Sequence, residues 1–210
     1  YNTVFFNGRQ WPVTCKQVQF YNGGNAGVQE GQATTTGYML FKRFNRSISK
    51  TSPGVASQNR PSIIFRLADF YLIYAEVANE VNPSDSRVLT YLNLVRERAG
   101  LPKVEILNPG IVGNKELQRA AIQRERQIEL ATEGQRYFDV RRWMIADKDG
   151  EGRQNGYAHG MNVRGTINDT EEFNRVVETE KIVFNRKMYL QPIPDHEMRK
   201  TQNLVQNPGW

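Results

Sequence analysis

The feature that most constrains the fold of this chain is a helical periodicity that begins just after Pro61. The pattern predicts a helix from about Ser62 to Glu80, and Asn82 with Pro83 ends it. Apolar residues three or four positions apart define one face of this helix: Leu67, Phe70, Tyr71, Tyr74, Ala75 and Ala78.

A second helix is predicted directly after this break. Ser84 is placed as its N-cap, and Gly100 with Pro102 supplies its end. Its inner stripe consists of Val88, Leu89, Leu92 and Val95. Because so short a connection cannot carry the chain elsewhere, we expect the two helices to pack antiparallel. The hairpin over 66–99 has the 34-residue period of a tetratricopeptide unit, so further helical pairs in a preceding part of the protein are expected to stack on it.

A third helix is predicted to begin near Asn114, and Gly134 interrupts it. Its apolar positions are Leu117, Ala121, Ile122, Ile128 and Ala131. Helical spacing returns over 137–146, which indicates a bend or a new helix there. A short final helix is expected over 195–201.

The remaining segments are rich in glycine, asparagine and proline, which favour loops. Residues 34–44 have the threonine and aromatic content of a strand, whereas 147–180 is predicted to be a surface loop. The chain is therefore predicted to be a mainly α scaffold with a helical pair, long irregular loops and a few short strands. We divide it into loops and short strands (1–62), a helical core (63–146), and a loop with a C-terminal segment (147–210).

Composition limits the functional classes that this chain can belong to. With 210 residues and 39% hydrophobic content, it can bury one sizeable core. The net charge of +6 arises from 28 basic residues mixed with 22 acidic ones, which is typical of a solvated surface rather than of a nucleic-acid interface.

The single cysteine, Cys15, excludes an internal disulfide and is expected to pack in the structure. Because the chain starts at Tyr1 without a leader segment, we interpret it as part of a longer protein.

A dense cluster of charges over 124–143 is the first candidate for chemistry. Glu125, Glu129 and Glu133 lie four residues apart on one helix face, and paired carboxylates can act as general acid and base. The alternative is a structural network, because nearby arginines hold carboxylates ionised. These arginines are Arg124, Arg126, Arg136, Arg141 and Arg142. We favour the structural interpretation.

No metal or cofactor site is predicted. His159 and His196 are far apart, and neither has a second ligand at metal-binding spacing. Residues 147–151 alternate acidic groups as calcium loops do, but no glutamate closes the loop. There is also no nucleophile elbow or phosphate-binding glycine loop, so an enzyme is not expected.

Aromatic residues within the polar loops are the best candidates for ligand contact. Flat rings beside amide and guanidinium donors can stack on sugars while the polar groups bind hydroxyls. Packing under the loops is the alternative for each ring. We predict a shallow binding surface formed by Trp11, Tyr21, Tyr157 and Arg153.

Several segments resemble the C-terminal region of the SusD/RagB family. They run in family order: TGYMLFKRF (36–44), RPSIIFRLADFYLIYAEVANE (60–80), YLNLVRERAGLP (91–102), ERQIELATEGQRYFDVRRW (125–143) and YLQPIPDHEMRKTQNLVQNPGW (189–210). The resemblance implies tetratricopeptide-like helical pairs and a non-enzymatic receptor that loads glycans or related nutrients into a SusC-like, TonB-dependent transporter. It also implies attachment to the outward face of a Bacteroidetes outer membrane through an N-terminal lipid that this chain lacks.

The motif residues of this resemblance are interpreted as scaffold rather than as a ligand site. They are Arg66, Glu76, Asn93, Arg96, Glu125, Glu129, Gly134, Arg136, Asp139 and Trp143. Two other functions stay open. One is a peptide- or protein-binding scaffold, a role that helical-repeat surfaces often have. A glycoside hydrolase would need two of Glu125, Glu129 and Asp139 to face an open cleft.

Overall fold

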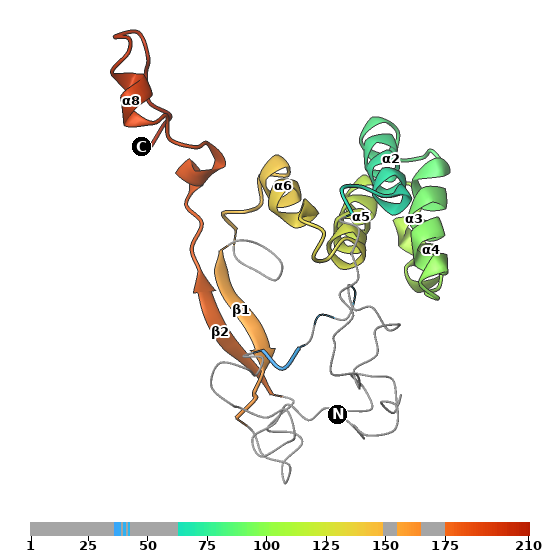
Figure 1. The fold of residues 1–210 in the computed structure, drawn as a ribbon. Coiled ribbons are helices and arrows are strands. Elements are labelled where there is room, and N and C mark those ends of the chain that lie inside the picture. Colours follow the sequence, from blue (N-terminus) through green and yellow to red (C-terminus); the bar gives the residue numbers. More distant parts are fainter. Residues whose placement is uncertain (1–35, 39, 41, 43–62, 149–154, 165–174) are drawn as a thin grey trace, which may run out of the picture. The chain divides into compact units, whose positions relative to one another are not determined.

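The computed structural model describes residues 36–38, 40, 42, 63–148, 155–164 and 175–210. The chain divides into two compact units, Asn59–Ile145 and Tyr1–Gln58 with Ala146–Trp210. Helices account for most of the regular structure, and the described residues contain one two-stranded sheet (Figure 1). The prediction of a mainly α fold is therefore confirmed.

The unit Asn59–Ile145 is built around three helices: α2 (Leu67–Val81), α3 (Arg87–Arg98) and α5 (Lys115–Glu129). The predicted hairpin is formed by α2 and α3, which lie side by side and are crossed by α5 (Figure 1). Their buried core consists of Leu72, Ala75, Val88, Leu92, Val95 and Ile122. Five of these core residues lie on the apolar faces predicted from helical spacing: Ala75, Val88, Leu92, Val95 and Ile122. Leu72 lies outside the face predicted for the first helix, and Leu67, Phe70 and Tyr74 on that predicted face are exposed.

The starts of the first two helices differ from the predictions. Helix α2 begins at Leu67, later than the predicted Ser62. The prediction of Ser84 as an N-cap is wrong, because its backbone N–H donates to Asn82 Oδ1 at 3.2 Å and keeps Ser84 in the turn. Ser86 precedes α3 instead.

The third helix begins as predicted, but it ends at Glu129, before the predicted interruption at Gly134. The Asn114 side chain caps α5 by accepting the backbone N–H of Leu117 at 3.1 Å. Gly134 adopts a left-handed φ of 83°, which allows the chain to turn into α6 (Gln135–Arg142). Two short elements, α4 (Val104–Leu107) and η1 (Pro109–Ile111), connect α3 to α5.

The C-terminal residues form an antiparallel hairpin of β1 (Gly156–Met161) and β2 (Val176–Ile182). The prediction that 147–180 is wholly loop is wrong here. Neither strand has the apolar alternation that indicates strands, and their pairing joins residues far apart in sequence. The predicted strand over 34–44 lies mostly outside the described residues.

The chain ends in η2 (Arg186–Tyr189) and the predicted short helix, α8 (Asp195–Met198). Trp210 Nε1 donates to the carbonyl of Lys187 at 3.0 Å and to that of Leu190 at 2.9 Å. The C-terminal tryptophan thereby closes the turn of η2.

We expect Gly160→Ala to destabilise the hairpin by about 1–3 kcal/mol, as overpacking does. A Cβ at Gly160 would lie 2.8 Å from Thr36 Cα and 3.0 Å from Thr179 Cγ2. The backbone has little room to move, because Met161 N donates to the Thr36 carbonyl at 2.9 Å. Urea denaturation would measure the change. Gly110→Ala is the control, since its nearest atom lies 3.6 Å away, and equal losses in both variants would contradict the prediction.

Candidate functional site

A shallow cleft on the β1–β2 hairpin is the best candidate for a ligand site. Its volume of about 540 Å³ lies within the range of small-molecule sites, about 300–1,000 Å³. Both strands and the residues beside them line it: Asn155, Gly156, Tyr157, His159, Glu178, Lys181 and Val183.

A β-bulge brings the polar side chains of this cleft onto one face. Tyr157 pairs with Lys181 and His159 with Glu178, and the register shifts beside Thr179. In a regular strand, residues three apart such as Glu178 and Lys181 would face opposite sides. The extra residue of a bulge restores them to the same side. The Thr179 hydroxyl supports this geometry by donating to a β1 carbonyl at 3.0 Å.

The Tyr157 ring is the main apolar surface of the cleft. It is 46% exposed, and the Lys181 ammonium lies 5.9 Å from its centroid. Asn155 has a supporting role, because its Oδ1 accepts the backbone N–H of Phe184 at 3.1 Å. The polar groups that point to solvent are therefore those of the exposed residues His159, Glu178 and Lys181.

This arrangement suits a polyhydroxylated ligand. A ring face for stacking lies beside one ammonium donor, one carboxylate acceptor and one imidazole, which can hydrogen-bond neighbouring hydroxyls. Of the predicted ligand residues, Tyr157 lines the cleft, whereas Trp11, Tyr21 and Arg153 lie outside the described residues. Glu178 and Lys181 were not among the predicted ligand residues, because nothing in the local sequence pattern indicates the bulge.

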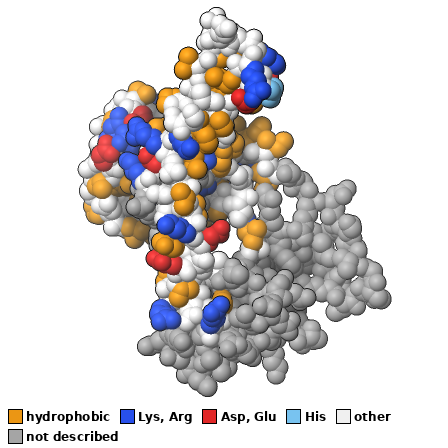
Figure 2. Space-filling model, turned by 90° about the vertical axis from the view of Figure 1, so that its left-hand side faces the viewer, with side chains coloured by type: hydrophobic (Ala, Val, Ile, Leu, Met, Phe, Trp, Pro, Cys, Tyr) orange, Lys and Arg blue, Asp and Glu red, His pale blue; other side chains and the backbone are white. Residues whose placement is uncertain are grey.

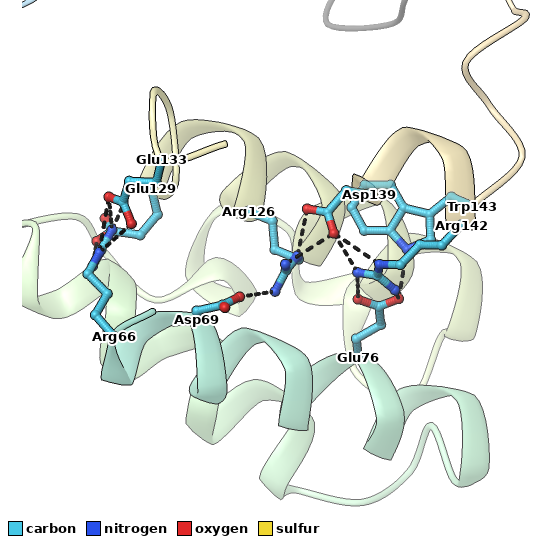
Figure 3. A network of polar contacts seen from close by, with 9 residues as sticks. All are labelled: Arg66, Asp69, Glu76, Arg126, Glu129, Glu133, Asp139, Arg142 and Trp143. Atoms are coloured by element: carbon cyan, nitrogen blue, oxygen red, sulfur yellow. Dashed lines mark hydrogen bonds and ion pairs between the residues drawn. The ribbon is translucent and has the colours of Figure 1, made fainter. Parts of the chain in front are cut away.

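Five of the residues predicted as scaffold take part in a network of polar contacts within Asn59–Ile145 (Figure 3): Arg66, Glu76, Glu129, Asp139 and Trp143. At one end, Arg66 just before α2 binds the Glu129 carboxylate at 2.6 Å and that of Glu133 at 2.8 Å. Hydrogen bonds to Glu133 and Glu129 raise the pKa of the Arg66 guanidinium, although its partial burial opposes this. The start of α2 is thereby tied to the end of α5.

At the centre of the network, Arg126 joins α2, α5 and α6 (Figure 3). Its Nη1 donates to Asp69 at 2.8 Å and its Nε to Asp139 at 2.9 Å. Arg142 lies between Asp139 and Glu76, at 2.9 Å and 2.7 Å. These contacts connect residues far apart in sequence.

Trp143 extends this network, whereas Asn93 makes separate contacts at the start of α4. Trp143 Nε1 donates to Glu76 at 2.7 Å, and the Arg136 guanidinium lies 5.8 Å from the Trp143 ring. Asn93 accepts the backbone N–H of Val104 at 3.0 Å and thereby holds the start of α4.

The carboxylates required for a glycoside hydrolase are all bound to arginines. Glu125 accepts from Arg96 at 2.8 Å, and the Glu125, Glu129 and Asp139 side chains are at most 10% exposed. Retaining and inverting enzymes need two carboxyl groups that face a sugar across a cleft. This geometry favours the structural interpretation of the cluster.

Two further observations concern ions and membranes. Among the described residues, no three His, Cys, Asp or Glu side chains are placed to hold a metal ion, and no helix is long and apolar enough to span a bilayer. Most of 147–151 lies outside these residues, but Asp147 accepts the Tyr189 hydroxyl at 2.6 Å, which lowers the pKa of Asp147.

Basic and acidic side chains lie next to one another on the face in Figure 2, so no single-sign patch stands out there.

Comparison with known proteins decides the family. The SusD family model matches residues 1–210. The chain belongs to the SusD family. Two SusD-like proteins of Formosa agariphila are 44% identical over 106 residues and 31% identical over 153 residues. The first match covers 50% of this chain and 19% of the relative, and the second covers 70% and 26%.

Other SusD-like proteins agree with this assignment. A relative from Bacteroides ovatus is 36% identical over 120 residues, 51% of this chain and 20% of its own length. The crystal structure of a SusD-like protein from Bacteroides fragilis matches with a TM-score of 0.72 and 28% identity, over 93% of this chain and 34% of that one. The matched segments thus make up 19–26% of the curated SusD-like relatives.

Proposed function

We propose that this SusD-family protein is a non-catalytic, cell-surface glycan-binding protein. It hands its ligand to a SusC-like, TonB-dependent transporter in the outer membrane, where an N-terminal lipid holds the whole protein. Membership in the SusD family over residues 1–210 supports the receptor class. The observation that carries the proposal for this chain is the exposed Tyr157 ring beside polar groups in the hairpin cleft.

In the proposed complex, one sugar ring stacks on Tyr157 through its apolar face. The Glu178 carboxylate accepts from sugar hydroxyls, and the Lys181 ammonium donates to them. Trp11, Tyr21 and Arg153 are proposed to add contacts to the same ligand. Affinity then comes from stacking and hydroxyl hydrogen bonds, and no bond in the glycan is broken.

We expect Tyr157→Ala to weaken glycan binding by about tenfold, or about 1.4 kcal/mol, because the stacking surface is lost. Calorimetric titration of the glycan class found by an array screen would measure it. Tyr137→Ala is the control, since Tyr137 is similarly exposed (43%) but lies on α6. Equal affinity of Tyr157→Ala and the native chain would remove the hairpin cleft from the proposal.

A peptide mixture titrated in parallel tests the second candidate function. Saturable binding of peptides without binding of any glycan would move the function to peptide or protein capture. Release of shorter glycans from a bound one would contradict the non-catalytic part of the proposal.

A further inference from the structure

Lys181 has no carboxylate within ion-pair distance among the described residues. Its ammonium instead lies 5.9 Å from the centroid of the Tyr157 ring, within the range of a cation–π contact. Three other lysines lie 3.8 Å, 3.0 Å and 2.6 Å from glutamate carboxylates: Lys103, Lys115 and Lys200. The positive charge of Lys181 is therefore open to a ligand in the hairpin cleft, which this side chain lines.

The register of the hairpin keeps the acidic group of the cleft away from Lys181. Tyr157 pairs with Lys181, and His159 pairs with Glu178. The two pairs are separated by about 7 Å, because they lie two residues apart on β1 at about 3.3 Å per residue. The cleft thus has a cation beside its aromatic ring and an anion one step further along the strands.

We propose that the hairpin cleft selects acidic glycans, in which the sugar stacked on Tyr157 carries a carboxylate or a sulfate ester that binds Lys181. This inference rests on the proposed function, because it requires a sugar on the Tyr157 ring. A sugar that stacks through its apolar face directs its substituents outward at the rim of the ring. Lys181 lies directly across the strands from Tyr157, so its ammonium is placed at this rim. The contact is a charge-assisted hydrogen bond, which is stronger than one between neutral groups.

The placement of the two charges favours an acidic sugar over an amino sugar. Coulomb energy falls with distance, so an anionic group about 3 Å from Lys181 is attracted about twice as strongly as Glu178 repels it from about 7 Å. An amino sugar on Tyr157 would meet the reverse arrangement, with the repelling charge nearer than the attracting one. The net charge of +6 adds a longer-range attraction for anionic glycans.

An array screen of the full-length protein tests this selectivity. The array would hold acidic glycans (polygalacturonate, alginate and carrageenan), neutral ones (galactan and mannan) and an amino glycan (chitosan). We expect acidic glycans to bind and this binding to be lost in Tyr157→Ala. The best acidic ligand would then be compared with its uncharged derivative, the methyl ester of a carboxylate or the desulfated form of a sulfate ester. The derivative should bind at least about tenfold more weakly, and the one that does so identifies the anionic group.

Lysine variants connect the selectivity to this cleft. Lys181→Gln should weaken binding of the acidic glycan by about tenfold in a calorimetric titration, whereas Lys181→Arg keeps the charge and should bind within about twofold of the native protein. Lys200→Gln is the control, because Lys200 is an equally exposed lysine that binds Glu197 near the C-terminus. The loss in Lys181→Gln should shrink as the salt concentration rises from about 0.1 M to about 1 M, since salt screens exposed charges.

The possible outcomes separate this inference from the proposed function. Binding of neutral glycans alone, lost in Tyr157→Ala, would reject the acidic ligand and leave the glycan receptor standing. Binding of chitosan that Glu178→Gln abolishes and Lys181→Gln does not would assign the cleft to amino sugars. Equal affinity of Lys181→Gln and the native protein for an acidic glycan would also overturn the inference. If no glycan on the array bound, both the inference and the proposed function would fail.

Discussion

Arg126→Met is expected to lower the free energy of unfolding by about 3–5 kcal/mol, the loss that follows when one partner of a buried ion pair is removed. Arg126 is only 3% exposed and binds both Asp69 and Asp139. Methionine keeps much of the volume but removes the charge, so two buried carboxylates lose a partner. Urea denaturation followed by the helical circular dichroism signal would measure the change.

An exposed arginine provides the control for this prediction. Arg119 binds Glu80 and Glu116 on the surface, where such pairs contribute about 0–1 kcal/mol. Arg119→Met should therefore have a small effect. Adding Asp69→Leu and Asp139→Leu to Arg126→Met should recover most of the stability, because a buried ion network can be replaced by apolar residues at little cost. A loss in Arg126→Met no larger than in Arg119→Met would show that the network contributes little.

Leu92→Ala is expected to destabilise the helical unit by about 2–5 kcal/mol, through lost apolar burial and the cavity left behind. Leu92 is fully buried in the core between α2, α3 and α5. The same urea experiment would measure it. The helices should still form in the folded protein, so the prediction concerns the midpoint of unfolding rather than the helix content.

The matched control for Leu92 lies two positions along the same helix. Leu94 is 42% exposed, and Leu94→Ala removes the same atoms with about the same change in helix propensity. Its effect should stay below about 1 kcal/mol. If the two variants lost equal stability, the assignment of the α3 faces would be wrong.

The helices of the unit Asn59–Ile145 could be predicted from the sequence because the signals for them are local. Positions three and four apart share a helix face, so Ala75, Leu92 and Ile122 could be placed in helices whose apolar sides must be buried. Asn114 and Gly134 mark boundaries through their own backbone and side-chain preferences. The segments that resemble the SusD family then indicated how these helices are combined.

The candidate site was harder to predict from the sequence, because its geometry depends on pairing between residues that are distant in sequence. β1 and β2 have little apolar alternation, and their pairing joins Gly156 to Ile182. Only the bulge beside Thr179 places Glu178 and Lys181 on the face of Tyr157. An exposed aromatic in a polar segment predicted Tyr157, which lines the cleft, but no comparable signal exists for its neighbours.

The sequence by itself determined most of the helical core, the N-cap of α5 and the family of this protein, since periodicity, capping residues and motif order are properties of neighbouring positions. Only the tertiary structure decided which charges are partnered and which apolar faces are covered. Arg66 meets Glu133 across 67 positions, and α2 has one covered and one exposed apolar face although both look alike in sequence. Which charges form ion pairs and which apolar faces are buried depends on the segments that the fold brings together. Composition and periodicity are local properties and do not determine these long-range contacts.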